Sequence, residues 1–483
     1  MKIGRRELLK GTGGALALLA AGCPDYGLPY DIVSFAAFPD GVVAAPDGDG
    51  VHLVARATEV RGSGNLLVEL ALDRDFRHLV AVAEALPGEH VRLPLEAVGP
   101  STRVYYRLRS RSSSSPIGSF RTLPAPDDAR DVRVALFSCQ GWQAGYFAAH
   151  RGMAAEELDL VVSLGDYIYE LTDDVGPRVD TIGIAGDGFA ETLDEYRQKY
   201  QLYRSDEDLQ AMHAAHGFVG VWDNHELAED GGHLGGRTPR VPLEQRKANG
   251  RAAFWEFMPM DAGPAGRPLY RSLRLGANLE IFLLDLHSHV EGESYLGAAQ
   301  RAWLFDGLAG STARWKLIGS STVMMGLDLS GGMPVNTNQW DGYPDERRAL
   351  VEHVLAHDIR GVVAITGDLH TFLAAPVTTT GRADGTTGFV EFCGGAISSL
   401  GLFDLAPHQT QVARSLEELA RAQNPHLDFI DVLARGYAVV EARRDELLVT
   451  FRSPENVWER GSPVRDLARF RVEHGVARVL PIP

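Results

Sequence analysis

LDLVVSLGDYIYE, residues 158–170, is an apolar run that ends in glycine, aspartate and two tyrosines. A short apolar run of this kind predicts a strand that is buried on both faces. Polar residues directly after such a strand lie at the end of the sheet, where α/β folds place their binding sites. There the carboxylate of Asp166 can bridge two cations, and the phenol of Tyr169 can reach one of them. The stretch therefore predicts an α/β fold with a metal site.

Beyond residue 128 the chain alternates such apolar runs with amphipathic patterns, which is typical of an α/β domain. Strands are predicted over residues 132–137, 158–164, 218–222, 279–284, 315–318, 362–366 and 389–392. Helices are predicted over residues 192–203, 243–256, 298–308 and 344–356, the last of which begins with proline, as first turns often do. Near the C-terminus, residues 436–440 and 447–451 predict a hairpin.

The N-terminal part of the chain has a different pattern, in which short runs of alternating apolar and polar residues are separated by turn residues. Strands are predicted over residues 51–54, 66–70, 90–93 and 104–108. Regular short strands without helical patterns favour a β-sandwich of immunoglobulin or fibronectin type III style. Because Pro124-Ala125-Pro126 indicates a linker, we expect an all-β sandwich over residues 30–124 and an α/β domain with layered sheets and flanking helices over residues 128–483.

Composition limits the classes of partner. The 483 residues are 45% hydrophobic and 23% charged, which is ordinary for a globular protein of two or three domains. The net charge of −17 argues against broad binding to nucleic acid or acidic membranes, since both carry charge of the same sign. Three cysteines are too few for a disulfide framework.

The first 22 residues predict an export signal. Arg5-Arg6-Glu7-Leu8-Leu9-Lys10 precedes an apolar stretch that is too short for a permanent transmembrane helix, so it resembles a signal for the twin-arginine export machinery. Ala20-Ala21-Gly22-Cys23 resembles a lipobox, although leucine is commoner at the position of Ala20. We expect a periplasmic, extracytoplasmic or secreted protein whose one membrane attachment would be a lipid anchor at Cys23.

Four of the predicted strands run directly into polar groups. These are Ser138-Cys139-Gln140, Gly165-Asp166-Tyr167-Ile168-Tyr169, Asp223-Asn224-His225-Glu226 and Gly367-Asp368-Leu369-His370. Because strand ends in an open α/β sheet share one edge, these loops should meet in one cleft and offer a thiolate, carboxylates, a phenolate, an amide oxygen and an imidazole.

Each of these groups taken alone has a plainer interpretation. Cys139 and Cys393 could be buried thiols or a disulfide, and Tyr169 could be a core aromatic residue. Asp368 could serve in a turn, and His370 could be a histidine with its hydrogen bonds satisfied. The run from Asp223 to Glu226 is different, because four adjacent polar groups are costly to bury without a purpose.

Together these blocks resemble the metallophosphoesterase superfamily and, more closely, the PhoD-like alkaline phosphatase family. The resemblance rests on the four blocks above, with Glu170 and Trp222 included, and on Gln339-Trp340-Asp341-Gly342-Tyr343 and Arg435-Gly436-Tyr437. In the N-terminal part it rests on Tyr105-Tyr106-Arg107 and Arg121-Thr122-Leu123-Pro124, so it spans almost the whole chain after the export signal.

The resemblance implies a site with two cations. It implies a ferric ion held by Cys139, Asp166, Tyr169 and His370, and a second ion, usually calcium or otherwise another divalent cation, held by Asp166, Asn224 and Asp368. His225 would lie beside the phosphoryl group as a hydrogen-bond donor or leaving-group acid, while Gln140 and Glu226 would orient the ligands. Anionic donors suit ferric iron, and carboxylate and amide oxygens suit a hard divalent cation.

Three positions depart from the family pattern. Asn224 stands where an aspartate is usual, which leaves the second site with one negative charge fewer and could change its preferred ion. The segment Leu284-Asp285-Leu286-His287 lacks the usual arginine, so His287 would take the place of a phosphate-contacting guanidinium. Ser320-Ser321 stands where the family often has Asn-Gln.

We therefore expect an exported alkaline phosphatase that hydrolyses phosphate mono- or diesters with hydroxide activated at a dinuclear centre, with Asp166, Asn224 and His225 as catalytic residues. A phospholipase D-like phosphodiesterase acting on lipid or a cell-wall polymer would use the same site. An exported binding protein with a vestigial site is the alternative from another class. Against it, all six predicted ligand positions carry residues that can bind a metal.

Overall fold

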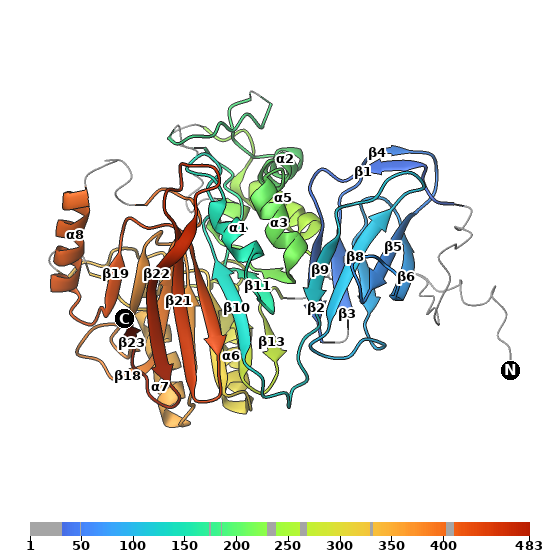
Figure 1. Cartoon of the computed structure of the whole chain (residues 1–483). Coiled ribbons are helices and arrows are strands. Elements are labelled where there is room, and N and C mark those ends of the chain that lie inside the picture. The colour runs from blue at the N-terminus through green and yellow to red at the C-terminus, as the bar shows by residue number, and fades with distance from the viewer. Residues whose placement is uncertain are drawn as a thin grey trace.

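The computed structural model describes residues 31–48, 50–172, 175–184, 186–228, 238–260, 268–328, 332–401 and 410–483 (Figure 1). The predicted export signal and Cys23 lie outside these ranges, so both stay predictions. No helix within the described ranges has the length and apolar character needed to cross a membrane.

The N-terminal part consists of antiparallel strands. β2 (Val43–Asp47), β3 (Gly50–Val54) and β7 (Val91–Pro94) form one sheet, and β6 (Leu79–Ala85), β5 (Leu66–Ala71), β8 (Arg103–Arg109) and β9 (Gly118–Arg121) form another. A small third sheet pairs β1 (Phe35–Ala37) with β4 (Thr58–Arg61). The two larger sheets bury one shared core that includes Val51, Val68 and Phe120. The immunoglobulin or fibronectin style of this region stays a prediction.

The first large sheet has seven strands. Their order is β12 (Phe218–Gly220), β11 (Leu160–Ser163), β10 (Val132–Phe137), β20 (Tyr437–Ala442), β21 (Glu446–Pro454), β22 (Val464–Glu473) and β23 (Leu480–Ile482). β10, β11 and β12 run parallel, whereas the pairs from β10–β20 onward are antiparallel. The predicted C-terminal hairpin is the pair β20–β21.

The second large sheet also has seven strands. Their order is β13 (Arg271–Leu275), β14 (Leu279–Leu283), β15 (Trp315–Ser320), β16 (Val362–Thr366), β18 (Thr387–Gly394), β17 (Phe372–Thr378) and β19 (Phe429–Asp431). Its four central strands, β14, β15, β16 and β18, are parallel, and β13, β17 and β19 are antiparallel to their neighbours.

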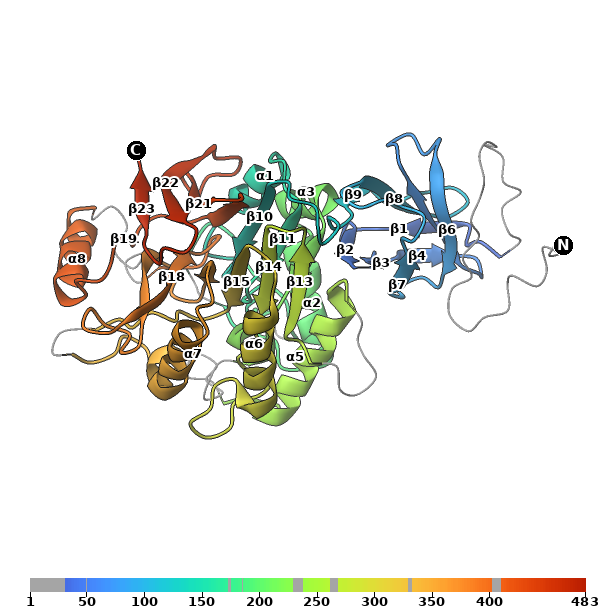
Figure 2. The same cartoon turned by 90° about the horizontal axis from the view of Figure 1, so that it is seen from below.

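Helices flank the two large sheets. They are α1 (Ala148–Ala154), α2 (Leu193–Arg204), α3 (Glu207–Ala215), α4 (Asn224–Leu227), α5 (Leu243–Phe257), α6 (Gly297–Gly310), α7 (Pro344–Ala356) and α8 (Thr410–Gln423), with a 3₁₀ turn at Trp340–Gly342. α6 and α7 pack on β14, β15 and β16 through Leu304, Leu308 and Leu350, on the side away from β10 and β11 (Figure 2). Thr192 caps α2 through a capping box. α7 starts with Pro344, as the sequence predicts.

The predicted site loops do not leave a single sheet. β10, β11 and β12 belong to the first large sheet, whereas β16 belongs to the second. The two sheets share one core, in which Val134 and Val161 lie with Leu317 and Ile365. The prediction of layered sheets with flanking helices is confirmed, whereas the expectation that all four site loops leave one open sheet is wrong. Its physical reason is that a strand buried on both faces looks the same in either of two packed sheets.

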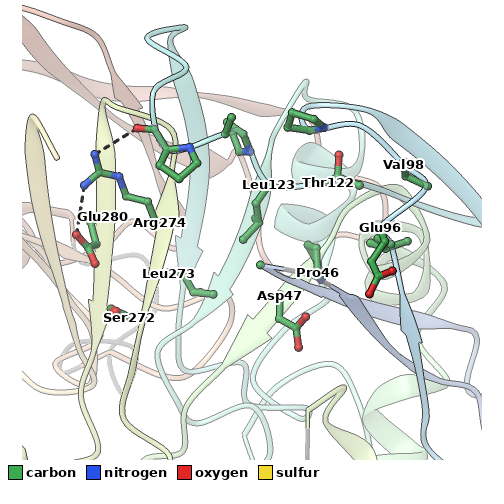
Figure 3. A pocket seen from close by; sticks show the side chains of 16 residues that line it. Pro46, Asp47, Glu96, Val98, Thr122, Leu123, Ser272, Leu273, Arg274 and Glu280 are labelled. Carbon is green, nitrogen blue, oxygen red and sulfur yellow. Dashed lines mark hydrogen bonds and ion pairs between the residues drawn. The ribbon is translucent and has the colours of Figure 1, made fainter. Parts of the chain in front are cut away.

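A pocket lies where the N-terminal sheets meet the α/β region (Figure 3). Its lining includes Pro46 and Asp47 at the end of β2, Leu123 directly before the linker and Leu273 in β13. Arg274 spans the junction, donating to the carbonyl oxygen of Pro126 at 3.5 Å and to the carboxylate of Glu280 at 3.4 Å. None of the predicted metal ligands lines this pocket, so we assign it to the packing of the two regions.

Candidate metal centre

The backbone at the predicted ligands is unusual. Eight non-glycine residues of the described chain have positive φ, and four of them are Cys139 (58°), Asp166 (53°), Asp368 (69°) and His370 (55°). Such residues cost on the order of 1 to 3 kcal/mol each and persist where the surrounding structure holds them, often at functional sites. The fold therefore maintains strain at the ends of β10, β11 and β16, where these residues lie.

A glycine allows two of the ligand loops to approach each other. Gly165 has φ of 109°, and a Cβ atom there would lie 2.5 Å from the Cβ of Asp223. No other residue type could adopt this conformation and leave that space clear. Gly165 thus brings the loop after β11 against the loop after β12.

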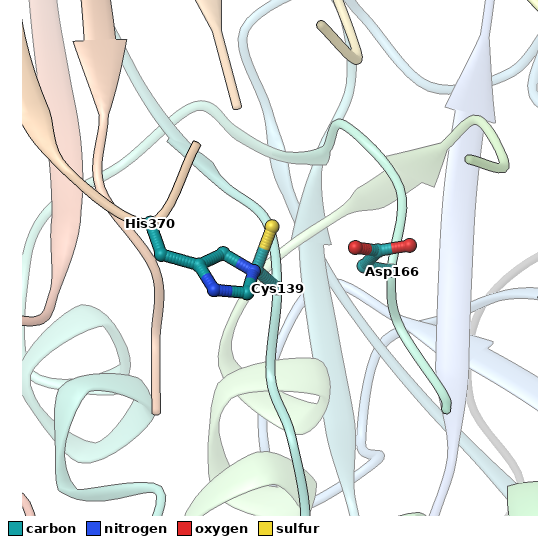
Figure 4. Close-up of side chains that lie close together, drawn as sticks. All are labelled: Cys139, Asp166 and His370. Atoms are coloured by element: carbon teal, nitrogen blue, oxygen red, sulfur yellow. The ribbon is translucent and has the colours of Figure 1, made fainter. Parts of the chain in front are cut away.

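Three side chains from three strand ends form the first group of possible ligands. The Sγ of Cys139, a carboxylate oxygen of Asp166 and a ring nitrogen of His370 all lie within 4.8 Å of one another (Figure 4). Cys139 and Asp166 are buried, and His370 is partly buried. The Nδ1 of His370 donates to the carbonyl oxygen of Leu400 at 2.6 Å. That hydrogen bond leaves the lone pair of the ring on Nε2, which faces the group.

The phenol of Tyr169 joins this group. Its oxygen lies 3.1 Å from a carboxylate oxygen of Asp166 and 3.1 Å from the Nε2 of His370. Tyr167 lies elsewhere, since its hydroxyl contacts the Nε2 of His213 at 2.7 Å and its ring stacks on Tyr200. Of Tyr167 and Tyr169, only Tyr169 has an oxygen that can contact a cation bound by Asp166.

The second group consists of carboxylates. Oxygens of Asp166, Asp223 and Asp368 lie within 4.8 Å of one another, so Asp166 is common to both groups. The sequence predicted Asn224 in this role and did not single out Asp223. Asn224 is the first residue of α4, is half-buried and directly follows Asp223. No signal in the sequence distinguishes Asp223 from Asn224, because both are polar residues directly after the predicted strand.

Glu226 ties two of the site loops together. Its carboxylate accepts hydrogen bonds from the backbone N–H groups of Asp166 at 3.0 Å, Tyr167 at 2.5 Å and Asp223 at 2.8 Å. Burial raises the pKa of Glu226 to about 7, and the three N–H donors act against that rise. Glu226 therefore fixes the backbone of two possible ligands without being a ligand itself.

Gln140 has a comparable structural role. Its side-chain N–H donates to the carbonyl oxygen of Tyr167 at 2.7 Å, and its side-chain oxygen accepts from the Nε2 of His150 at 2.6 Å. His150 is fully buried on α1 and was not predicted from the sequence. The pair connects α1 to the loop that carries Asp166 and Tyr169.

His225 is held on two sides. Its Nδ1 lies 2.8 Å from a carboxylate oxygen of Glu170, and its ring centroid lies 4.1 Å from that of Tyr169. Glu170 is fully buried and has Arg246 at 3.9 Å, which balances its charge. The backbone N–H of His225 also donates to Asp166 at 3.3 Å. The imidazole is thereby fixed beside the residue that the two groups share.

His287 approaches the second group. Its Nε2 lies 2.5 Å from a carboxylate oxygen of Asp223, and the hydroxyl of Ser321 donates to the same oxygen at 2.9 Å. Gln339 donates to Asp368 on the other side. Two of the residues that depart from the family pattern, His287 and Ser321, therefore contact Asp223 of the second group.

The electrostatics of the two groups favour cations. Burial and the neighbouring charges of Asp166 and Asp368 raise the pKa of Cys139, and burial with the charge of Asp166 raises the pKa of Tyr169. Burial and the charge of Asp223 raise the pKa of Asp368 to about 6. Bound cations would reverse these shifts, because they stabilise thiolate, phenolate and carboxylate. The donor set thus fits one cation with sulfur, phenolate and imidazole ligands and one with oxygen ligands.

Comparisons with known proteins show which proteins the chain resembles. The family model described as PhoD-like phosphatase matches residues 134–451. The curated protein "Alkaline phosphatase D" from Bacillus subtilis (strain 168) is 28% identical over 438 residues, covering 83% of this chain and 73% of that protein.

Two solved structures are similar in fold. One is titled "Structure of PhoD" and has a TM-score of 0.78 at 25% identity, covering 95% of this chain and 94% of the other. The second is a purple acid phosphatase from yellow lupin (Lupinus luteus) seeds, with a TM-score of 0.53 at 14% identity, covering 90% and 73%. The likeness to the lupin enzyme concerns the fold alone, and it extends to the mixed sheets with flanking helices.

Proposed function

The chain belongs to the PhoD-like phosphatase family, and from this premise we propose that it is an exported alkaline phosphatase with a dinuclear metal centre. Membership makes it a phosphoric ester hydrolase, related to the Bacillus subtilis protein named alkaline phosphatase D. The observation that carries the proposal is the pair of ligand groups that share Asp166. A carboxylate common to two cations is how two-metal phosphoesterases hold both ions near one phosphoryl group.

The proposed ligands follow from the two groups. Cys139, Asp166, Tyr169 and His370 would hold a ferric ion, because thiolate and phenolate stabilise a high charge. Asp166 and Asp368, with Asn224 and the added Asp223, would hold calcium or another divalent cation. When bound, the two ions would lower the pKa of water and neutralise charge on the phosphoryl oxygens.

His225 is proposed to hold a proton at Nε2 beside the phosphoryl group. The carboxylate of Glu170, 2.8 Å from Nδ1, accepts the hydrogen on Nδ1 and orients the ring, and its negative charge favours the doubly protonated imidazolium, which also carries a hydrogen on Nε2. Nε2 lies on the edge of the ring opposite Nδ1, so it is the atom that would donate to a phosphoryl or leaving-group oxygen. His287, next to Asp223, is proposed to contact the phosphate in place of an arginine.

Three further parts of the proposal concern the rest of the chain. We propose an immunoglobulin-like or fibronectin-like sandwich over residues 30–124 and a catalytic domain over residues 128–483, supported by the separate N-terminal core. Export by the twin-arginine route is proposed from Arg5 and Arg6, and lipidation from the sequence around Cys23. These assignments do not alter the chemistry of the site.

Metal analysis of natively exported protein, combined with two substrates, tests the function. We expect one iron and one divalent cation in each chain, and turnover of a nitrophenyl phosphate monoester, of its bis-ester, or of both. The faster of the two substrates distinguishes a monoesterase from a phosphodiesterase. Protein that carries both ions and hydrolyses neither ester would contradict the catalytic proposal and favour the binding-protein alternative.

A further inference from the structure

The segment that follows β18, residues 396–400, packs against the first ligand group, Cys139, Asp166 and His370, and against Tyr169. The backbone N–H groups of Ser398 and Ser399 donate to the carbonyl oxygen of Cys139 at 3.4 and 3.2 Å. The carbonyl oxygen of Leu400 accepts from the Nδ1 of His370 at 2.6 Å. The hydroxyl of Ser399 donates to the phenol oxygen of Tyr169 at 2.7 Å. One short segment thus contacts three of the four proposed iron ligands.

The direction of the Ser399 hydrogen bond follows from its surroundings. The backbone N–H of Gly141 donates to the Ser399 oxygen at 2.8 Å, so that oxygen already accepts one hydrogen. A serine hydroxyl carries a single hydrogen of its own, and this hydrogen is the one that points to Tyr169. Ser399 is 3% exposed, so water does not compete strongly for the bond.

Two hydrogen bonds from Arg435 and Gly436 hold this segment in place. The Nε of Arg435 donates to the carbonyl oxygen of Ser399 at 2.7 Å, and Arg435 is buried. The backbone N–H of Gly436 donates to the carbonyl oxygen of Ala396 at 2.6 Å. Both hydrogen bonds come from residues directly before β20, so they restrict movement of Ser399 relative to the phenol of Tyr169.

We propose that Ser399 is a positioning residue that holds the Tyr169 oxygen and weakens its electron donation to a bound ferric ion. The inference rests on the proposed function, because it requires Tyr169 to be an iron ligand. A hydrogen bond donated to a phenolate stabilises the electrons that the phenolate would otherwise give to the metal, just as hydrogen bonds to metal-bound sulfur tune reduction potentials. Ser399 therefore sets both the geometry and the electronic character of the iron ligand.

The chain offers a matched control in the neighbouring serine. Ser398 is also buried, at 1% exposure, but its hydroxyl donates to the backbone carbonyl oxygen of Gly141 at 2.8 Å and not to a ligand. Ser398→Ala and Ser399→Ala remove the same group from adjacent positions. Only the second substitution removes a hydrogen bond to Tyr169, and Ser399→Thr keeps the hydroxyl.

The test is the visible charge-transfer absorption and the ferric reduction potential of iron-loaded protein. Ser399→Ala should move the band to longer wavelength and lower the potential, because the phenolate becomes a stronger donor. Ser398→Ala and Ser399→Thr should keep both near their wild-type values. A band and potential that stay unchanged in Ser399→Ala, while Tyr169→Phe weakens the band, would overturn the inference and leave the iron assignment intact. If wild-type protein with bound iron lacks such a band, the assignment of Tyr169 itself fails.

A second measurement needs no substitution and applies even if Ser399→Ala does not fold. Resonance Raman spectra excited in the charge-transfer band report the vibrations of the iron-bound phenolate. Exchange of the Ser399 hydroxyl hydrogen for deuterium should shift the phenolate carbon–oxygen stretch between H₂O and D₂O. A stretch that is the same in both solvents would contradict the donated hydrogen bond.

Discussion

The two ligand groups share Asp166 but are held by different parts of the protein. Around Cys139 and His370 the contacts come largely from the main chain of residues 396–400. Around Asp223 the contacts come from side chains, namely His287 at 2.5 Å and Ser321 at 2.9 Å. Main-chain contacts survive most substitutions, whereas side-chain contacts change with each one. We therefore expect the first group to bind the same metal when neighbouring side chains are substituted. The ion and substrate preference of the second group should depend on those side chains.

The positions that depart from the family pattern agree with this division. Asn224 precedes His225 in α4, and His287 and Ser321 both contact Asp223. None of these three residues contacts Cys139 or Tyr169 in the hydrogen bonds of the described chain.

Removal of the shared carboxylate should disable both groups. Asp166→Ala should lower kcat/KM for a nitrophenyl phosphate by about a thousandfold or more, since it removes a ligand to both ions. Asp358→Ala is the control, because Asp358 also has positive φ, 48°, but its side chain is 79% exposed. Metal analysis and steady-state kinetics check the result. If Asp166→Ala keeps its metals and its activity, Asp166 is not the bridge.

Loss of the thiolate should affect the first group alone. Cys139→Ser should weaken iron binding by about a hundredfold or more, because it removes the thiolate that would bind the metal directly and not only a residue that contacts a ligand. The second cation should remain, since Cys139 is not in the carboxylate group. Cys393→Ser is the control, as Cys393 is also buried but contacts the carbonyl oxygen of Gly367. Equal loss of both metals from Cys139→Ser would show that the groups are not separable.

Changes at His287 should affect substrate binding more than metal content. His287→Ala should raise KM about tenfold, which is the loss of roughly 1.4 kcal/mol of interaction with an anionic substrate. His287→Arg should restore or lower KM, because a guanidinium contacts phosphate through two donors. His289→Ala, two residues away, is the matched control. A fall in kcat with KM unchanged would contradict a role in phosphate binding.

Acid should destabilise the helix that supports the first group. Burial lowers the pKa of His150 from 6.5 to about 3, so this histidine stays neutral in the folded protein. The stability that its neutral form contributes is complete above pH 6.5 and is lost as pH falls from about 6.5 toward 3, at up to about 1.4 kcal/mol per pH unit.

His150→Gln can still donate to Gln140 but does not titrate. Denaturant unfolding of metal-free protein at pH 7.5 and pH 5 should show a smaller loss of stability in the variant than in the wild type. The other buried histidines titrate in both proteins, so the difference isolates His150. An identical loss in the two proteins would mean that His150 is not buried as a neutral group.

Much of the catalytic fold could be predicted from the sequence. β10, β16 and α7 have the predicted limits, because buried parallel strands are short continuous apolar runs and because Pro344 starts its helix. β22 was missed, since a register shift opposite Phe451 and Arg452 interrupts its alternation of apolar and charged residues. α1 was missed because its small residues give no amphipathic pattern. The division of the strands between two sheets is a property of packing that no single run reveals.

The site residues could be predicted from the sequence where a side chain that can bind a metal directly follows a predicted strand. Cys139, Asp166, Tyr169, Asp368 and His370 were singled out in this way, and the structure brings them together. Asp223 was overlooked because the sequence could not show which of two adjacent polar side chains faces Asp166. Ser399 and Leu400 gave no signal, because they act through a hydroxyl and a backbone carbonyl that occur in any loop.

The most direct test of the two-group centre is a crystal structure of natively exported protein with anomalous scattering data at the iron edge. We expect an iron peak in contact with Cys139, Asp166, Tyr169 and His370. A second, lighter cation should lie on the other side of Asp166, among the oxygens of Asp223 and Asp368. Iron bound elsewhere, or a single ion that does not contact Asp166, would contradict the shared-carboxylate centre.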